Sequence, residues 1–221
     1  MSERNFPVTA VLDAIEPAVA LFPKASMHEL ADDGFRSLFQ QVVACLISVR
    51  TFEEVTMPIC RELFAVAPDA AAMVALGQDG MLQIIRRSTF SDRKAGQIMA
   101  IARRTEDEFG GEIACDADLV RSFNGIGVKC TNLALGIACG TPLVCVDVHV
   151  HRIVNRWGYV ATRTPEQTTD ALDALMPDDQ KVRINRLLVP FGKHLCTAAR
   201  PNCSTCPVLD QCAQVGVTTA R

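Results

Sequence analysis

Apolar residues recur at steps of three and four positions along almost the whole chain, and this spacing constrains the fold class. Between residues 35 and 47 they fall on one stripe of a helix, formed by Phe35, Leu38, Phe39, Val42, Val43, Leu46 and Ile47. Similar stripes predict helices over residues 51–66, 80–86, 91–109, 116–123, 129–138, 147–157, 164–175 and 178–195. No stretch alternates apolar and polar residues long enough to require a strand. We therefore expect an all-α protein.

Two prolines mark the ends or breaks of predicted helices. Residues 8–21 also carry the helical period, and Pro17 should break or kink that helix at Glu16. The segment Thr164-Pro165-Glu166-Gln167 is a helix start signal. It offers a capping hydroxyl, a proline at the first helical position and a glutamine three residues on to close a capping box.

The composition indicates a globular protein without a membrane span. A chain of 221 residues can bury one core or two modest ones, and 49% hydrophobic with only 5% aromatic residues favours packed helices. The longest apolar run, residues 133–146, is interrupted by glycines and a proline, so it is too short to span a bilayer. We expect a soluble protein of a reducing compartment. With a formal net charge of −3, any nucleic-acid binding must come from local groups of positive charge.

Four thiols lie within 17 positions near the C-terminus, at Cys196, Cys203, Cys206 and Cys212. Their C-x6-C-x2-C-x5-C spacing suits one metal centre, and four thiolates can hold either a [4Fe-4S] cluster or zinc. Disulfides would need an oxidising compartment, and residues 1–7 lack the layout of a signal peptide. Six further cysteines stand singly in apolar stretches and are expected to act as small hydrophobes: Cys45, Cys60, Cys115, Cys130, Cys139 and Cys145.

A Gly-x-Gly sequence lies between two predicted helices, in Phe123-Asn124-Gly125-Ile126-Gly127-Val128-Lys129. Two glycines permit a sharp turn and leave amide N–H groups uncovered at the start of the next helix. The helix dipole favours an anion there, such as a DNA phosphate. By itself the motif more often marks an ordinary helix end followed by a turn.

The order of the motifs is more specific than any one of them. Lys129 stands two residues beyond the second glycine, Asp147 follows 18 residues later in Val146-Asp147-Val148-His149, and the cysteine spacing comes last. In this combination, from about residue 35 to Cys212, the chain resembles the endonuclease III family of base-excision DNA glycosylases. The resemblance implies that the four cysteines hold a [4Fe-4S] cluster, with zinc as a minor alternative.

The resemblance also implies two all-helical domains with a DNA groove between them. One is a six-helix barrel with a helix-hairpin-helix motif at residues 31–141, and the other is an iron-sulfur cluster domain from residues 1–30 and 142–221. The implied activity is that of a bifunctional DNA glycosylase and AP lyase of base excision repair. Its partner is double-stranded DNA with damaged bases or abasic sites. It removes oxidised or ring-saturated pyrimidines, such as thymine glycol, and nicks the strand by β-elimination.

Lys129 and Asp147 are the predicted catalytic residues. An amine attacks C1′ of the damaged nucleoside only without its proton, and the positive end of a helix dipole at Lys129 disfavours the ammonium form. Asp147 would stabilise the cation that develops at the sugar and assist proton transfers, and it could equally cap its own helix. His149 and His151 are expected to be buried or hydrogen-bonded and not catalytic.

The predicted DNA contacts lie in the hairpin, at Asn124, Gly125, Ile126 and Gly127, and at three further residues. Expelling a base leaves a gap in the duplex, which Arg50 and Phe90 would fill. Their alternative interpretations are an arginine facing a phosphate and a core phenylalanine. Arg200 is the basic residue between Cys196 and Cys203 that could meet a phosphate.

Two departures from the family pattern predict weaker DNA binding with fewer phosphate contacts. Asn124 stands where the family usually has proline, and Arg200 is alone where the family has several basic residues. Two other functions remain open: an adenine-specific mismatch glycosylase, disfavoured by Lys129 and by the nine residues after Cys212, and a non-catalytic iron-sulfur module for DNA binding or redox sensing. We expect a monomer, nucleoid-associated in a bacterial or archaeal cytoplasm.

Overall fold

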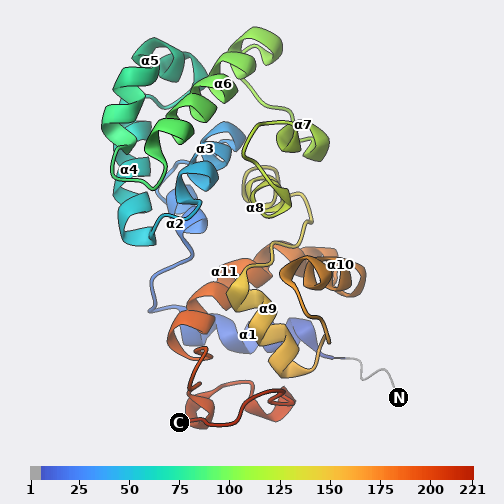
Figure 1. Ribbon diagram of the computed structural model, residues 1–221. Helices are drawn as coiled ribbons and strands as arrows, with labels where there is room; N and C mark the ends of the chain where they lie inside the picture. The colour runs from blue at the N-terminus through green and yellow to red at the C-terminus, as the bar shows by residue number, and fades with distance from the viewer. Residues whose placement is uncertain (1–5) are drawn as a thin grey trace. The chain divides into compact units, whose positions relative to one another are not determined.

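The computed structural model describes residues 6–221, which form helices and loops without a strand in that range (Figure 1). The predicted all-α fold class is confirmed. The helices are α1 (Val8–Val19), α2 (Ser26–Asp32), α3 (Leu38–Ser48), α4 (Glu53–Val66), α5 (Ala70–Ile85), α6 (Ser91–Phe109), α7 (Ala117–Arg121), α8 (Val128–Cys139), α9 (Val148–Trp157), α10 (Pro165–Leu175), α11 (Asp178–His194) and the short 3₁₀ helices η1 (Cys203–Thr205) and η2 (Leu209–Gln211). Within the described residues, no helix is both long and apolar enough to cross a membrane.

The chain divides into two compact units. One is Ser26–Thr141, and the other joins Pro142–Arg221 to the N-terminal segment up to Ala25. A domain start at residue 31 falls inside α2, which contacts α3, α4 and α8. Because those helices belong to the unit Ser26–Thr141, the whole of α2 belongs to it as well.

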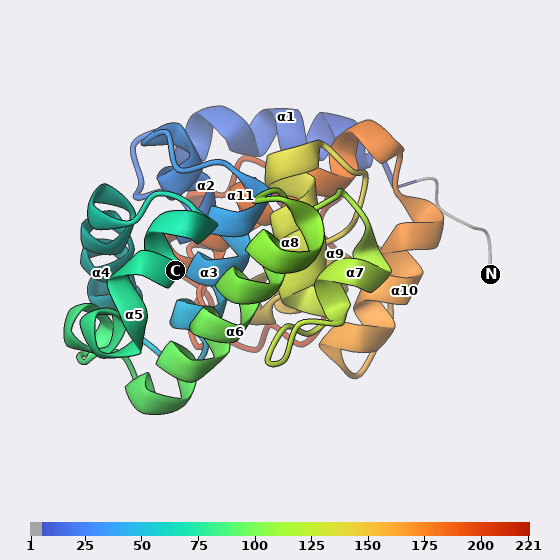
Figure 2. The same cartoon turned by 90° about the horizontal axis from the view of Figure 1, so that it is seen from above.

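In the unit Ser26–Thr141, α3 is the central helix. It contacts α2, α4, α6 and α8 (Figure 2). Every residue from Leu38 to Ile47 is buried. A capping box fixes its start, because the side chains of Ser37 and Gln40 each bond the other's backbone N–H. The buried Gln41 amide donates to the Phe35 carbonyl at 2.7 Å. The amide nitrogen of this buried side chain thus finds backbone acceptors, which lowers the cost in free energy of a polar residue on the central helix.

The other unit packs α1 and α9 against α11, with α10 beside α9. Figure 1 shows α1, in blue, alongside α9 and α11, although they are far apart in the sequence. The core is built from apolar residues of all four helices, with Leu12, Ile15, Ile153, Trp157, Leu172, Leu188 and Phe191 among its buried members. Phe6 extends this core by stacking on the rings of Trp157 and Tyr159, at centroid distances of 5.5 and 4.7 Å.

Two helices differ from the sequence prediction. The predicted helix over residues 80–86 is the second part of α5, which starts at Ala70 and is broken internally by Gly77 at φ 72°. The periodicity does not predict the first part of α5, because residues 70–76 are all apolar and show no alternation between an apolar and a polar face. The predicted break at Pro17 is wrong: α1 continues through Pro17 to Val19. The cost in helix stability is small there, because Pro17 lies close to the end of the helix and removes only one backbone N–H donor.

The predicted start of α10 is confirmed. The Thr164 hydroxyl accepts the N–H of Gln167 at 3.3 Å, and Pro165 is the first helical residue. The Gln167 side chain accepts the N–H of Arg163 at 3.0 Å. The glutamine therefore closes the cap one residue earlier than a capping box requires.

Candidate active site and cysteine centre

The turn between α7 and α8 is anchored from inside by two apolar residues. Phe123 and Ile126 are buried, and the Ile126 N–H donates to the Phe123 carbonyl at 3.1 Å. The Arg104 guanidinium covers the Phe123 ring at 5.2 Å from its centroid. The Gly-x-Gly sequence therefore forms a hairpin. Ile126, a predicted DNA contact, is only 7% exposed, so its side chain holds the shape of the turn.

The two glycines of the hairpin have different structural roles. Gly125 has φ 95°, and a Cβ on it would lie 2.5 Å from Gln97 Nε2 and 3.0 Å from Leu46 Cδ1. Gly127 is the N-cap of α8, where a Cβ would meet no atom within 4 Å and no side chain caps the helix. Asn124 is exposed, and its Oδ1 accepts from Gln97 at 3.4 Å. Gly125 allows close packing on α3 and α6, and Gly127 leaves the start of α8 uncovered for an anion.

Lys129 is the second residue of α8 and is exposed. Its neighbour Cys130 is partly buried, and a hydrogen bond with the Cys45 thiol of α3 lowers the pKa of Cys130 to about 7, against the opposing effect of burial. The positive charge of Lys129 acts in the same direction as that bond. A thiol that ionises near neutral pH beside the predicted nucleophile is a feature that the sequence analysis missed.

Asp147 is the N-cap of α9. Its Oδ1 accepts the N–H groups of His149 and Val150, both at 2.9 Å. These two bonds fix the carboxylate at the end of the helix, where the positive end of the dipole favours a negative charge. The other oxygen, Oδ2, makes no hydrogen bond with residues 6–221. The capping role therefore leaves one carboxylate oxygen for a second task.

The two histidines after Asp147 are hydrogen-bonded. His151 Nδ1 lies 2.7 Å from the Thr168 hydroxyl, and His149 Nδ1 lies 3.2 Å from Arg152 Nη2. Burial lowers the pKa of His149 below its usual value, while the charge of Asp147 acts in the opposite direction. A Cβ on Gly192 would stand 2.8 Å from His149 Nδ1, so glycine is required for α9 to approach α11 here.

Four cysteines from distant points of the C-terminal loops line one cavity. Cys196 follows α11, Cys203 opens η1, Cys206 follows η1 and Cys212 follows η2. Trp157, Phe191 and Leu195 also line this cavity. Over residues 6–221, no three His, Cys, Asp or Glu side chains are placed to hold one metal ion. In the described part of the chain, the four cysteines therefore share one cavity without forming a site for a single ion.

The surroundings of this cavity disfavour the ionised form of two of its thiols. Burial raises the pKa values of Cys206 and Cys212, and repulsion among the neighbouring thiols adds to that shift. Arg156, which is buried, donates to the Cys196 sulfur at 3.3 Å and to the Thr197 and Ala198 carbonyls. Cys206 and Cys212 resist ionisation, and the Arg156 guanidinium lies beside Cys196, so a positively charged centre would stabilise the ionised form of this donor set.

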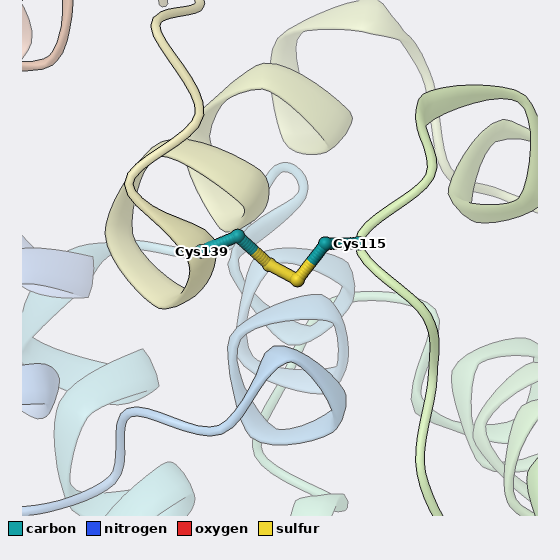
Figure 3. Close-up of a disulfide and its surroundings, with 2 residues drawn as sticks. All are labelled: Cys115 and Cys139. Carbon is teal, nitrogen blue, oxygen red and sulfur yellow. A yellow bond between two sulfur atoms is a disulfide. The ribbon is translucent and has the colours of Figure 1, made fainter.

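The structure corrects the prediction for Cys115 and Cys139, which form a disulfide with a Cα–Cα distance of 6.1 Å. Figure 3 shows Cys139 at the end of α8 and Cys115 on the extended segment before α7. The bond thus closes the ends of the hairpin. No local pattern predicts this pair, because the two cysteines meet only when the end of α8 lies beside the segment before α7. The expectation of buried thiols is confirmed for Cys45, Cys60 and Cys145.

The two residues predicted to fill the gap in the duplex, Arg50 and Phe90, have a strained backbone. Arg50 and Phe90 have φ values of 53° and 59°, in the left-handed region that residues with a Cβ rarely occupy. Both are exposed, Phe90 by 57%, so the interpretation of Phe90 as a core residue is wrong. Arg200 is also exposed, and its Nε donates to the Ala220 carbonyl at 3.4 Å. A buried lysine between the two strained loops, Lys94, was not predicted.

Comparison with known proteins agrees with this geometry. Residues 43–178 match the family HhH-GPD, described as a superfamily of base excision DNA repair proteins. The chain is 32% identical to endonuclease III of Thermotoga maritima over 174 residues, which cover 79% of this chain and 82% of that one. It is 29% identical to endonuclease III of Escherichia coli K12, over 84% and 88% of the two chains.

Solved structures show the same fold. A non-covalent endonuclease III–DNA complex matches with a TM-score of 0.79 at 22% identity, over 97% of this chain and 96% of that one. A thermostable thymine-DNA glycosylase also reaches 0.79, at 16% identity, over 93% and 95% of the two chains. The family match and the level of identity to the Thermotoga relative decide the assignment. The chain belongs to the endonuclease III family, DNA glycosylases with AP lyase activity, within the HhH-GPD superfamily of base excision repair proteins.

Proposed function

We propose that this protein excises oxidised or ring-saturated pyrimidines, such as thymine glycol, from duplex DNA and then nicks the strand, with Lys129 as the nucleophile. The observation that carries the proposal is the position of Lys129 at the uncapped start of α8, directly behind the Gly125–Gly127 turn. A phosphate bound at that turn would bring a deoxyribose close to the lysine. Membership of the endonuclease III family supplies the reaction type.

Lys129 would carry the reaction through a covalent link to the sugar. Its unprotonated nitrogen bonds to C1′ while the bond from C1′ to the base breaks, and the base leaves with a proton. The sugar ring opens to a Schiff base, a proton leaves C2′, and the C3′–O bond breaks. Water then releases the lysine from an unsaturated aldehyde. The lysine is regenerated, so it acts as a catalyst.

Asp147 would act on the charge that develops at the sugar. Its Oδ1 is held by two backbone N–H groups, so the orientation of the carboxylate is fixed before the substrate arrives. Oδ2 can then face a cationic sugar or relay a proton. The capping bonds and the proposed catalytic role are complementary because they use different oxygens.

The four cysteines Cys196, Cys203, Cys206 and Cys212 would hold a [4Fe-4S] cluster. Four cysteine thiolates are the ligand set that such a cluster would use, and the same set can hold zinc. The shared cavity and the Arg156 bond to the Cys196 sulfur support a metal centre here, and membership of the endonuclease III family favours the cluster. When bound, the cluster would fix the C-terminal loops and could exchange an electron.

The proposed DNA contacts follow the exposed positions. Asn124, Gly125 and Gly127 would meet a phosphate at the hairpin, and Arg200 another on the cysteine loop. Arg50 and Phe90 would fill the gap left by the extruded base. The two units would correspond to a barrel domain and a cluster domain. The protein would act on chromosomal DNA in a bacterial or archaeal cytoplasm.

Borohydride trapping tests the proposal. The protein is incubated with duplexes that carry thymine glycol, an abasic site, or adenine opposite 8-oxoguanine, and the Schiff base is reduced to a stable cross-link. We expect trapping on the first two duplexes. Activity on the third alone would indicate an adenine-specific mismatch glycosylase, and binding without trapping on any of them would indicate a non-catalytic module.

The Lys129→Ala variant identifies the nucleophile. Trapping should fall below detection while the melting temperature and the affinity for the abasic duplex stay near those of the parent. Lys24→Ala removes another exposed lysine and is the matched control, with trapping unchanged. Trapping by Lys129→Ala at the parental rate would assign the nucleophile to another residue.

A further inference from the structure

Two loops of the unit Ser26–Thr141 are tied together by one buried lysine. Lys94, on α6, is 3% exposed. Its Nζ donates to the carbonyls of Ile47 and Val49, at 2.6 and 2.8 Å, and to the Thr51 hydroxyl at 2.8 Å. All three donors of the ammonium group are therefore used. Both carbonyls lie at the C-terminal end of α3, where a positive charge is favourable.

The Thr51 hydroxyl extends this connection to the second loop. Its oxygen accepts from Lys94 Nζ and also from the backbone N–H of Thr89, at 3.1 Å. The same hydroxyl donates to the Val49 carbonyl at 3.4 Å. One donor and two acceptor sites are what a hydroxyl has, so Thr51 is fully engaged. We name Lys94 and Thr51 together the loop bracket.

The loop bracket stands beside both strained residues. Arg50 lies between Val49 and Thr51, and Phe90 follows Thr89. Among the described residues, only Gln214 shares their positive φ without being glycine. Strained backbone persists where its surroundings over-determine it, and it is commonly found at ligand-binding sites. Here the hydrogen bonds fall on the residues next to Arg50 and Phe90.

We propose that Lys94 and Thr51 are positioning residues that hold Arg50 and Phe90 at a fixed separation, so that both side chains enter the duplex as one preorganised unit. The inference rests on the proposed function, because it needs a base to be displaced. Because the loop bracket is formed before DNA binds, the two loops lose no further conformational entropy when the base is extruded. If Lys94 served only to cap α3, its bonds to the Ile47 and Val49 carbonyls would suffice. The Thr51 hydroxyl, which accepts from both Lys94 and the Thr89 N–H, connects the lysine to the second loop as well.

The pair Thr51→Val and Thr51→Ser tests the inference with little risk to folding. Valine keeps the shape but removes the hydroxyl, whereas serine keeps the hydroxyl. We expect Thr51→Val to slow single-turnover excision of thymine glycol roughly ten- to hundredfold, because small misplacements at a reacting centre cost that much. Nicking of a preformed abasic site should change less, since no base has to be displaced, and Thr51→Ser should stay near the parent on both substrates.

Hydrogen exchange of the free protein gives a second readout that does not depend on activity. Thr51→Val should raise amide exchange in residues 48–52 and 88–91 together, and Thr51→Ser should not. Parental excision by Thr51→Val would overturn the inference, as would equal losses in both variants or faster exchange in one loop alone. If the parent itself fails to trap on either duplex, the proposed function fails, while the exchange data still decide whether the bracket couples the loops.

Discussion

Asp147 illustrates how one side chain can serve folding and chemistry together. Its Oδ1 is occupied by the N–H groups of His149 and Val150, and its place at the start of α9 puts a negative charge at the positive end of a dipole. Both interactions hold the carboxylate in one orientation. Variants of this residue can separate the two roles, because an amide can cap a helix but cannot carry the charge.

We expect Asp147→Asn to keep the stability of the parent and to lose activity. Asparagine is as good an N-cap as aspartate, while the loss of the charge should slow excision by about a hundredfold or more. Asp147→Ala should lose the same activity and also about 1 kcal/mol of unfolding free energy. Urea unfolding and single-turnover excision measure the two effects. Undiminished excision by Asp147→Asn would remove the carboxylate from the mechanism.

The second prediction at this scale concerns the pH dependence of Lys94. Burial lowers the pKa of Lys94 to about 8 from 10.5, and the facing Cys60 stays a neutral thiol because burial raises its pKa to about 12. Between pH 8 and 10.5 the unfolded chain therefore holds a proton that the folded chain has released. The unfolding free energy of the parent should rise with pH in that window, relative to Lys94→Met, by up to about 1.4 kcal/mol per pH unit.

Denaturant titrations of both proteins between pH 7 and pH 10 provide the measurement. The Cys60 contribution cancels in the difference between the two proteins, because both contain that thiol. Below pH 8 the difference should be flat. A difference that falls as pH rises would mean that the ammonium form of Lys94 is stabilised, and not disfavoured, by its surroundings.

At the scale of elements, the hairpin of α7 and α8 depends on contacts at both of its ends. At the turn, Gly125 packs on Gln97 and Leu46. At the open end, the disulfide of Cys115 and Cys139 spans 24 residues, and closing a loop of that length stabilises the folded state by roughly 3 kcal/mol. The hairpin is thus fixed at the turn by steric fit and at the open end by a covalent bond.

Alanine substitutions at Gly125 and Gly127 should separate the effect of packing on stability from the effect of the turn on DNA binding. Gly125→Ala adds a Cβ 2.5 Å from Gln97 Nε2 and forces alanine to φ 95°, so we expect a loss of about 1–3 kcal/mol in unfolding free energy. Gly127→Ala meets no atom within 4 Å and should keep parental stability. Its methyl group would nevertheless crowd the start of α8 and weaken binding to an abasic duplex, measured by fluorescence anisotropy. Parental affinity in Gly127→Ala would argue against a phosphate at this turn.

At the scale of the whole molecule, each of the two units has its own buried core. The C-terminal loops are joined to the core of their unit through α9, because Arg156 bonds Cys196, Thr197 and Ala198. Apart from the four cysteines, Val208 and Pro201 are among the few apolar residues buried or partly buried in these loops. A bound metal centre would therefore contribute much of their stability.

Removal of the metal centre should act on one unit and spare the other. After chelation or oxidative loss of the centre, amide exchange should rise in residues 196–217, while residues 26–141 keep their protection. The visible absorbance of an iron-sulfur cluster should disappear in parallel, and a colourless protein that loads zinc would instead indicate a zinc centre. Equal loss of protection in both units would show that the centre supports the whole fold.

Most helices, the hairpin and the clustering of the four cysteines can be predicted from the amino-acid sequence, because they depend on periodicity, turn chemistry and spacing along the chain. The start of α10 at Thr164 and the turn at Gly125 are local features of this kind. The tertiary structure decided the features that depend on which helices meet. The burial of Lys94 under two loops, the bond of Cys115 to Cys139 and the contact of Cys130 with Cys45 join positions at least 24 residues apart. No local pattern encodes such pairs, since each arises from the packing of α3, α6 and α8 against their neighbours.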